Sequence, residues 1–267
     1  MNLVCFFLLT FALTWTTWLA SARWAGPDNS GVFSVGGPVF LLGVFAPAIV
    51  SLALTARAEG GEGVRRLVAR IGRWQVDGRL YLFAVGYMAA LRLTAALIQR
   101  AATGAWPRFG DTPLLLMLGA LLVSTWVQAG EEIGWRGYAL PRLAKHIGLS
   151  AASMILGVLW ASWHLPLFFM QHTDSLGQSF PLYLTYVVAL SVAMAWLYWK
   201  SDGSLLLVML MHGANNQTRN IVPSAVPSAA DALTLSTYLP AWLTVTLLWV
   251  AAFYLLVRMP NIRYSNR

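Results

Sequence analysis

Long apolar stretches alternate along the chain with short breaks that are polar or contain Gly and Pro. A helix needs roughly 20 apolar residues to cross the hydrocarbon core of a bilayer. The pattern therefore predicts an all-α, polytopic integral membrane protein with about eight transmembrane helices. The expected spans are 2–20, 32–55, 80–99, 113–140, 150–171, 181–199, 204–220 and 237–258.

The composition supports a membrane protein. Hydrophobic residues make up 58% of the 267 residues and charged residues only 10%, whereas a soluble domain has about 25% charged residues. The mean hydropathy is +0.63. We therefore expect residues 1–267 to form a single transmembrane domain in contact with the lipid bilayer. The formal net charge of +8 is interpreted as a membrane-orientation signal, and no nucleic-acid partner is expected.

Lys and Arg residues are distributed unevenly among the expected connectors. If the N-terminus is cytoplasmic, 13 of the 18 lie on the cytoplasmic side, four lie on the other side, and Arg92 lies within a span. Cytoplasmic loops carry an excess of Lys and Arg, so both termini are predicted to be cytoplasmic. The expected location is the cell membrane, the inner membrane of a bacterium, with the protein crossing it several times. The cytoplasmic set is Arg57, Arg65, Arg66, Arg70, Arg73, Arg79, Arg136, Arg142, Lys145, Lys200, Arg258, Arg263 and Arg267, and the opposite set is Arg23, Arg100, Arg108 and Arg219.

The first span and the most basic connector each need an interpretation. Residues 20–22 resemble a signal-peptide cleavage site, but no basic residue precedes Phe6 and the apolar run is long enough to span, so an uncleaved first helix is expected. In the connector 60–78, apolar residues recur at helical spacing between arginines, which is typical of a helix on the membrane surface. These apolar residues are Val64, Leu67, Val68 and Ile71.

Two adjacent glutamates, Glu131 and Glu132, lie in the fourth expected span and are followed by Arg136. Carboxylates at bilayer depth cost at least a few kcal/mol and usually serve a function. Glu132 and Arg136 are four residues apart and share a helix face, so they are expected to pair. Glu131 points about 100° away, which leaves it able to accept a proton as a general base. The alternative is a structural salt-bridge cluster of all three residues.

Two further spans carry histidines. His164 precedes Pro166, which frees a backbone carbonyl and often marks a kink or cavity, although a single histidine in an apolar helix is more often a packing residue. His212 and Asn216 are four residues apart, so both could donate hydrogen bonds to one developing oxyanion. The alternative for this pair is a polar clamp between helices. The histidines expected to face solvent are His146 and His172.

The expected depth of His164 in the membrane disagrees with the expected depths of Glu131 and His212. At 1.5 Å per residue, Glu131 and His212 lie roughly 14 and 12 Å from the cytoplasmic ends of their spans, whereas His164 lies at roughly 21 Å. The fifth helix is therefore expected to start later, to tilt or to kink.

Together, the three segments resemble the CAAX-protease and bacteriocin-processing (CPBP) family of intramembrane proteases, also called the abortive-infection family, and in particular its members similar to CAAX prenyl protease 2. Residues 131–137, EEIGWRG, match the family motif EExxxR. Trp160 to His164 matches FxxxH with Trp in place of Phe, and His212 to Asn216 matches HxxxN. The motifs follow the family order within residues 110–220, which would form the catalytic core.

The resemblance implies a role for each residue. Glu131 would activate a water for attack on a peptide carbonyl, and His164 would orient or polarise that water. The implied oxyanion hole consists of His212 and Asn216, and the residues implied to hold the electrostatics of the site are Glu132 and Arg136.

A metal-dependent mechanism is the main chemical alternative. Two histidines and a glutamate can ligate a catalytic zinc ion, and members of the resembling family are often labelled metalloproteases. However, no HExxH sequence is present, and His164 and His212 lie in separate spans. A metal-free glutamate mechanism is therefore favoured over a divalent metal such as zinc.

The expected function is that of an intramembrane endopeptidase acting on a membrane-associated peptide or protein. A prenylated tail, a leader peptide and a membrane-bound signal peptide are candidate substrates, and a leader or other peptide is favoured because the chain looks bacterial. The alternatives are a proton-coupled transporter, disfavoured because no internal repeat is present, and a non-catalytic scaffold or immunity protein of the same fold. The sequence does not indicate an oligomeric state.

Overall fold

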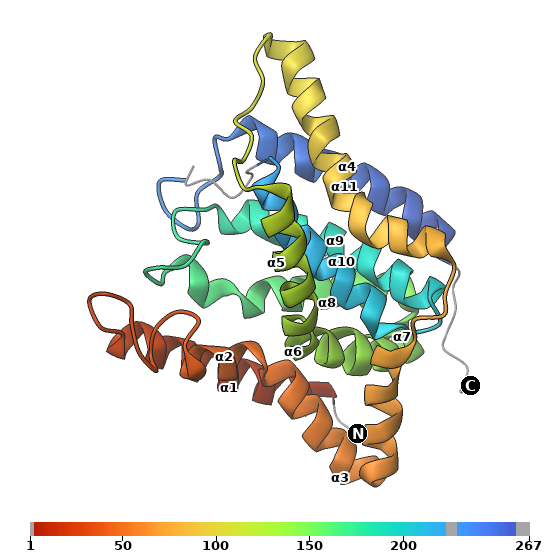
Figure 1. Ribbon diagram of the computed structural model, residues 1–267. Coiled ribbons are helices and arrows are strands. Elements are labelled where there is room, and N and C mark those ends of the chain that lie inside the picture. The colour runs from red at the N-terminus through yellow and green to blue at the C-terminus, as the bar shows by residue number, and fades with distance from the viewer. Residues whose placement is uncertain (1–2, 223–228, 260–267) are drawn as a thin grey trace.

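The regular structure of the protein is helical throughout the residues that the computed structural model describes, 3–222 and 229–259 (Figure 1). The predicted all-α class is thus confirmed for this part of the chain. The α-helices are α1 (Leu3–Trp24), α2 (Pro38–Val44), α3 (Ala46–Val68), α4 (Gly78–Thr103), α5 (Leu114–Val127), α6 (Ala129–Glu132), α7 (Leu140–Ile147), α8 (Leu149–Trp163), α9 (Phe180–Lys200), α10 (Leu205–Gln217) and α11 (Leu239–Arg258). The 3₁₀ segments are Ala69–Gly72, Leu165–Phe168 and Thr218–Asn220, and Ile133–Ala139 is π-helical.

Every expected span contains a helix, but not every helix is long enough to cross a bilayer. Among the described residues, five helical segments are long and apolar enough, and the bent pair α2–α3 would make six. Helices α8 and α10 have only 15 and 13 residues. The chain is therefore a multi-pass membrane protein, while the count of eight spans and the side of each terminus remain predictions.

The fourth span differs from the expected one, which covered residues 113–140. It breaks at Gln128, bends there (Figure 1), continues through the π-helical segment and ends only at Ile147. Single π-helical turns inside α-helices often occur at functional sites. The basic residues of α7 made its helix look like a connector in the sequence, which is why its end was placed too early.

The fifth span also ends at a different place than predicted. Helix α8 stops at Trp163 instead of continuing to residue 171, because Pro166 has no backbone N–H to continue the helix. Counted from the turn at Gly148, Glu131 lies 17 residues before it and His164 lies 16 residues after it. Both residues line one cavity, so the fold does not separate them as the expected depths did.

The connector 60–78 is helical at its start, as predicted. Helix α3 continues through a kink at Gly60 (φ 65°) to Val68. Leu67 is buried, and a Cβ atom added to Gly137 would lie 2.9 Å from its side chain. One face of this helix thus packs on the protein itself, and its contact with the membrane surface remains a prediction.

Helix α9 lies at the centre of the bundle and supports the helices that carry the candidate site. Of its apolar window, 61% is buried, against 22–39% in the other long spans. Gly157 of α8 allows a close approach to α9, because a Cβ atom there would lie 2.7 Å from Cα of Val188. By contrast, α5 exposes leucines such as Leu115 (80%) and Leu122 (68%), which suits contact with lipid.

Candidate active site

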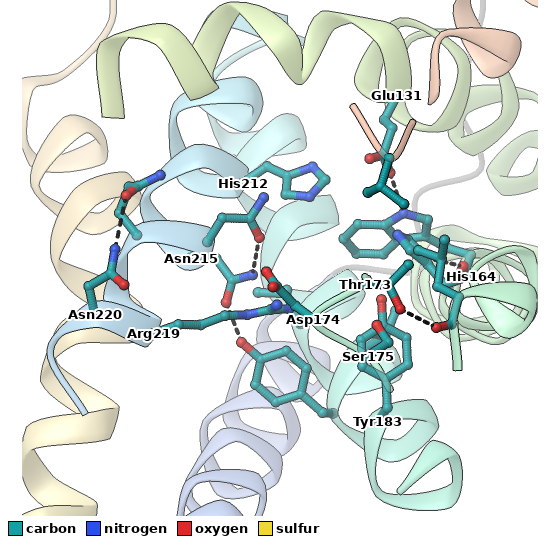
Figure 2. A pocket seen from close by; sticks show the side chains of 18 of the residues that line it. Glu131, His164, Thr173, Asp174, Ser175, Tyr183, His212, Asn215, Arg219 and Asn220 are labelled. Atoms are coloured by element: carbon teal, nitrogen blue, oxygen red, sulfur yellow. Dashed lines mark hydrogen bonds between the residues drawn. The ribbon is translucent and has the colours of Figure 1, made fainter. Parts of the chain in front are cut away.

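The four predicted catalytic residues line one cavity of about 490 Å³ between α6, α8, α9 and α10 (Figure 2). Glu131 comes from α6, His164 from the end of α8, and His212 and Asn216 from α10. The fold thus brings together residues that are up to 85 positions apart in the sequence. Their individual roles remain predictions.

Glu132 and Arg136 form a fully buried ion pair, as their spacing predicts. Nη1 of Arg136 lies 2.9 Å from Oε1 and 3.1 Å from Oε2 of Glu132, and both side chains are 0% exposed. The same Oε1 lies 2.8 Å from Nδ1 of His212. Glu132 does not line the cavity. A buried carboxylate with two such partners is satisfied, so Glu132 holds Arg136 and His212 in place.

The hydrogen bonds of the two histidines determine which ring nitrogen faces the cavity. Nδ1 of His164 lies 2.9 Å from the backbone oxygen of Trp160, which can only accept, so this nitrogen carries the proton. Nδ1 of His212 lies 2.8 Å from Oε1 of Glu132, an oxygen that also accepts from Arg136, so this nitrogen is assigned as a donor as well. In both imidazoles, Nε2 is therefore left for groups inside the cavity.

Trp160 has a role that the sequence did not reveal. Its indole N–H donates to Oε2 of Glu131 at 2.7 Å, a contact that the phenylalanine of the FxxxH motif could not make. The guanidinium carbon of Arg136 lies 4.2 Å from the centre of its ring, and the His212 ring meets it edge-on at 5.0 Å. Nε and Nη2 of Arg136 have no hydrogen-bond partner among the described residues, and the indole face compensates electrostatically. Trp160 thus contacts both Glu131 and Arg136, the ion-pair partner of Glu132.

A directed chain of hydrogen bonds leads to Asn216. Nη2 of Arg92 donates to the hydroxyl of Tyr186 at 3.3 Å, and this hydroxyl donates to Oδ1 of Asn215. Nδ2 of Asn215 then donates to Oδ1 of Asn216 at 3.2 Å. Because a guanidinium can only donate, the direction of the whole chain is fixed. The amide N–H groups of Asn216 are therefore left to donate elsewhere, and this residue lines the cavity.

The mouth of the cavity is polar. Its lining includes Asp174, Arg219 and Asn220, which are labelled in Figure 2. His172 lines the cavity as well. His146 and His172 are both exposed, as expected, but His172 also contributes to this mouth. It comes from the connector between α8 and α9, which the motifs do not include.

The site does not assemble an evident set of metal ligands. Within residues 3–222 and 229–259, no three His, Cys, Asp or Glu side chains are grouped as a metal site would require. His212 uses Nδ1 for Glu132, and Glu132 is occupied by Arg136. The candidate donors that remain are Glu131 and the two Nε2 atoms.

The segment that carries the three motifs is similar to known proteins. Residues 112–218 match the Rce1-like family model, described as type II CAAX prenyl endopeptidase Rce1-like. This Rce1-like segment contains all six predicted site residues, and the resemblance predicted from the motifs is thereby confirmed. CAAX prenyl protease 2 of Methanococcus maripaludis is 26% identical over 236 residues, which cover 81% of this chain and 83% of that protein. Arg92, the start of the hydrogen-bond chain to Asn216, lies outside the Rce1-like segment.

Proposed function

We propose that the protein is an intramembrane endopeptidase that hydrolyses a peptide bond of a membrane-associated peptide or protein. The observation that carries the proposal is the environment of Glu131. It is buried at the cavity wall and does not pair with Arg136. It shares the cavity with two imidazoles whose Nε2 atoms bond to none of the described residues. A carboxylate that is held but not neutralised in such a place suits a general base.

The proposed reaction begins with a water molecule between Glu131 and the scissile carbonyl. Glu131 takes a proton from this water while the water oxygen forms a bond to the carbonyl carbon. The C–N bond then breaks as the same proton passes from Glu131 to the leaving nitrogen. The products are a carboxylic acid and an amine, and the enzyme returns to its starting state. His164 orients the water through Nε2.

The proposed oxyanion hole consists of His212 and Asn216. Both line the cavity, and the hydrogen-bond chain from Arg92 leaves the amide N–H groups of Asn216 to donate. For His212 to donate from Nε2 while Nδ1 donates to Glu132, its ring must carry a proton on both nitrogens, and the Glu132 carboxylate would offset that charge. Such preorganised donors stabilise the tetrahedral intermediate without reorganisation during the reaction.

The mechanism that we propose uses no metal ion. Its support is that, among the described residues, no three His, Cys, Asp or Glu side chains are grouped closely enough to hold a metal ion. We further propose that both termini are cytoplasmic and that the protein resides in the inner membrane of a bacterium, from the distribution of Lys and Arg.

The relative's name makes a prenylated C-terminal tail a candidate substrate beside leader peptides.

A peptide library tests this function. Purified protein in detergent should cleave a subset of the library, and Glu131→Ala and His164→Ala should each abolish that cleavage. Addition of a strong chelator should leave the wild-type rate unchanged. Cleavage that survives both substitutions would overturn the glutamate mechanism, and loss of cleavage with the chelator, restored by zinc, would overturn the metal-free one.

A further inference from the structure

The basic connectors gather at one end of the bundle. Arg73 contacts Asp202 in the turn between α9 and α10, and its backbone oxygen accepts from Ser204 at 2.6 Å. Arg142 of α7 pairs with Glu59 of α3 at 2.9 Å. The connectors α3–α4, α7–α8 and α9–α10 therefore share one end, which we call the basic end. It lies toward the right of Figure 1, where α11 also ends.

The remaining connectors meet at the opposite end. The backbone N–H of Gly110 donates to Ile221 at 3.1 Å, and that of Phe180 donates to Ala232 at 2.8 Å. Val35 lines the cavity together with residues 172–175. The connectors α1–α2, α4–α5, α8–α9 and α10–α11 thus lie together, and the mouth of the cavity opens among them.

The two ends differ strongly in charge. Ten Lys and Arg residues of the described chain belong to the basic end and four to the mouth end. Such an excess of Lys and Arg marks the cytoplasmic side of a membrane protein. The basic set is Arg57, Arg65, Arg66, Arg70, Arg73, Arg79, Arg142, Lys145, Lys200 and Arg258, and the set at the mouth end is Arg23, Arg100, Arg108 and Arg219.

We infer that the cavity opens on the non-cytoplasmic face of the membrane and that its substrates are polar peptide segments presented there. The mouth carries both charge signs, in Asp174 and Arg219, together with His172 and Asn220. These groups can form hydrogen bonds and ion pairs with the backbone and side chains of a hydrated peptide. The orientation rests on the fold and the charges alone, whereas the nature of the substrate also rests on the proposed peptidase function.

Cysteine labelling tests the orientation independently of activity. The chain has one cysteine, Cys5, so Cys5→Ala provides a cysteine-free background. Gln171, beside the mouth, and Gln75, at the basic end, are both exposed and form a matched pair of glutamines. In intact bacterial cells that express the full chain, a membrane-impermeant maleimide should label Gln171→Cys but not Gln75→Cys. After permeabilisation it should label both. Labelling of Gln75→Cys in intact cells, or failure to label Gln171→Cys there, would overturn the orientation.

A second experiment tests the side from which substrates enter. A membrane-impermeant fluorogenic peptide, chosen because the purified protein cleaves it, is added to spheroplasts and to inverted membrane vesicles. Spheroplasts should cleave it, and inverted vesicles should do so only after detergent is added. The opposite preference would overturn the inference. If the purified protein cleaves no peptide at all, the proposed function fails while the labelling result still decides the orientation.

Discussion

At the scale of single residues, the two adjacent glutamates have different surroundings and therefore different expected tasks. Glu132 is completely buried between Arg136 and His212, while Glu131 reaches the cavity and accepts one hydrogen bond from Trp160. A one-residue step along the helix separates them. The ion pair accounts for Glu132 as a structural residue, whereas Glu131 forms no ion pair with any described residue.

Glu132→Gln should therefore destabilise the protein. Loss of one partner leaves a buried charge on Arg136 uncompensated, which typically costs about 3–5 kcal/mol. Denaturant unfolding of the purified protein in detergent measures this. The matched control is Glu62→Gln, because the Glu62–Arg65 pair is exposed and exposed pairs contribute little. Equal unfolding midpoints for the two variants would contradict the structural role of Glu132.

Trp160→Phe should reduce catalysis with little effect on substrate binding. The substitution restores the phenylalanine of the family motif but removes the N–H that holds Glu131 at 2.7 Å. A hydrogen bond to a charged group is worth about 1.5–3 kcal/mol, so kcat should fall at least about tenfold while KM stays nearly constant. Trp242→Phe is the control, since its indole N–H donates to the backbone oxygen of Ser236, away from Glu131. An unchanged kcat in Trp160→Phe would show that Glu131 needs no such anchor.

Tyr186→Phe should lower kcat through Asn216. The hydroxyl of Tyr186 accepts from Arg92 and donates to Asn215, which fixes the orientation of the Asn215 amide. A neutral hydrogen bond is worth about 1 kcal/mol, so its loss should lower kcat about fivefold. In an Asn216→Ala background, the same change should have no further effect, which a double-mutant cycle detects. Tyr87→Phe is the control, since that hydroxyl has no hydrogen-bond partner in the described part of the chain. Additive losses would place Tyr186 outside the path to Asn216.

At the scale of elements, the π-helical segment is the part of the fold on which the site most depends. It lies between α6 and α7 and carries Arg136, and it packs closely against the start of α3. A Cβ atom on Gly134 would lie 2.6 Å from the backbone of Pro47. Backbone atoms cannot move aside as a flexible side chain can, so only glycine fits at this crossing.

Gly134→Ala should accordingly destabilise the protein and lower its activity. Overpacking typically costs about 1–3 kcal/mol, and here it would also displace Arg136. Thermal unfolding in detergent and turnover of a cleaved peptide measure the two effects. Gly119→Ala in α5 is the control, because a Cβ atom there meets nothing within 4 Å and removal of a helical glycine is neutral or stabilising. Equal behaviour of the two variants would mean that the crossing at Pro47 is not tight.

The elements also show what the sequence could predict. Apolar runs between Gly, Pro and polar breaks were sufficient to find α1, α4, α9 and α11 to within a few residues. The same criterion failed at the end of the fourth span, since α7 exposes Lys145 and His146 and does not look like part of a membrane helix. The end of α8 was missed because the effect of Pro166 on the helix was interpreted as a kink.

At the scale of the whole molecule, the grouping of the motif residues around one cavity could be predicted from the sequence, because the three motifs keep fixed spacings on helices. The contacts between motifs were not visible. The sequence analysis treats Trp160 only as a residue in place of the Phe of the motif, although a departure from a motif close to a proposed base was a usable signal. Arg92 was noted only as an arginine within a span, and a charge at that depth usually has a function. Its partner Tyr186 lies 94 residues away, a distance that no local pattern covers.

The central claim is that Glu131 moves the proton in peptide-bond hydrolysis. The most direct measurement is kcat of Glu131→Gln on a peptide that the wild-type protein cleaves, with the unfolding midpoint measured on the same preparation. The side chain keeps its shape and can still contact Trp160, but it can no longer act as a base. A general base contributes about 100-fold or more, so kcat should fall at least that far while the midpoint stays unchanged. Wild-type turnover by a folded Glu131→Gln protein would contradict the account.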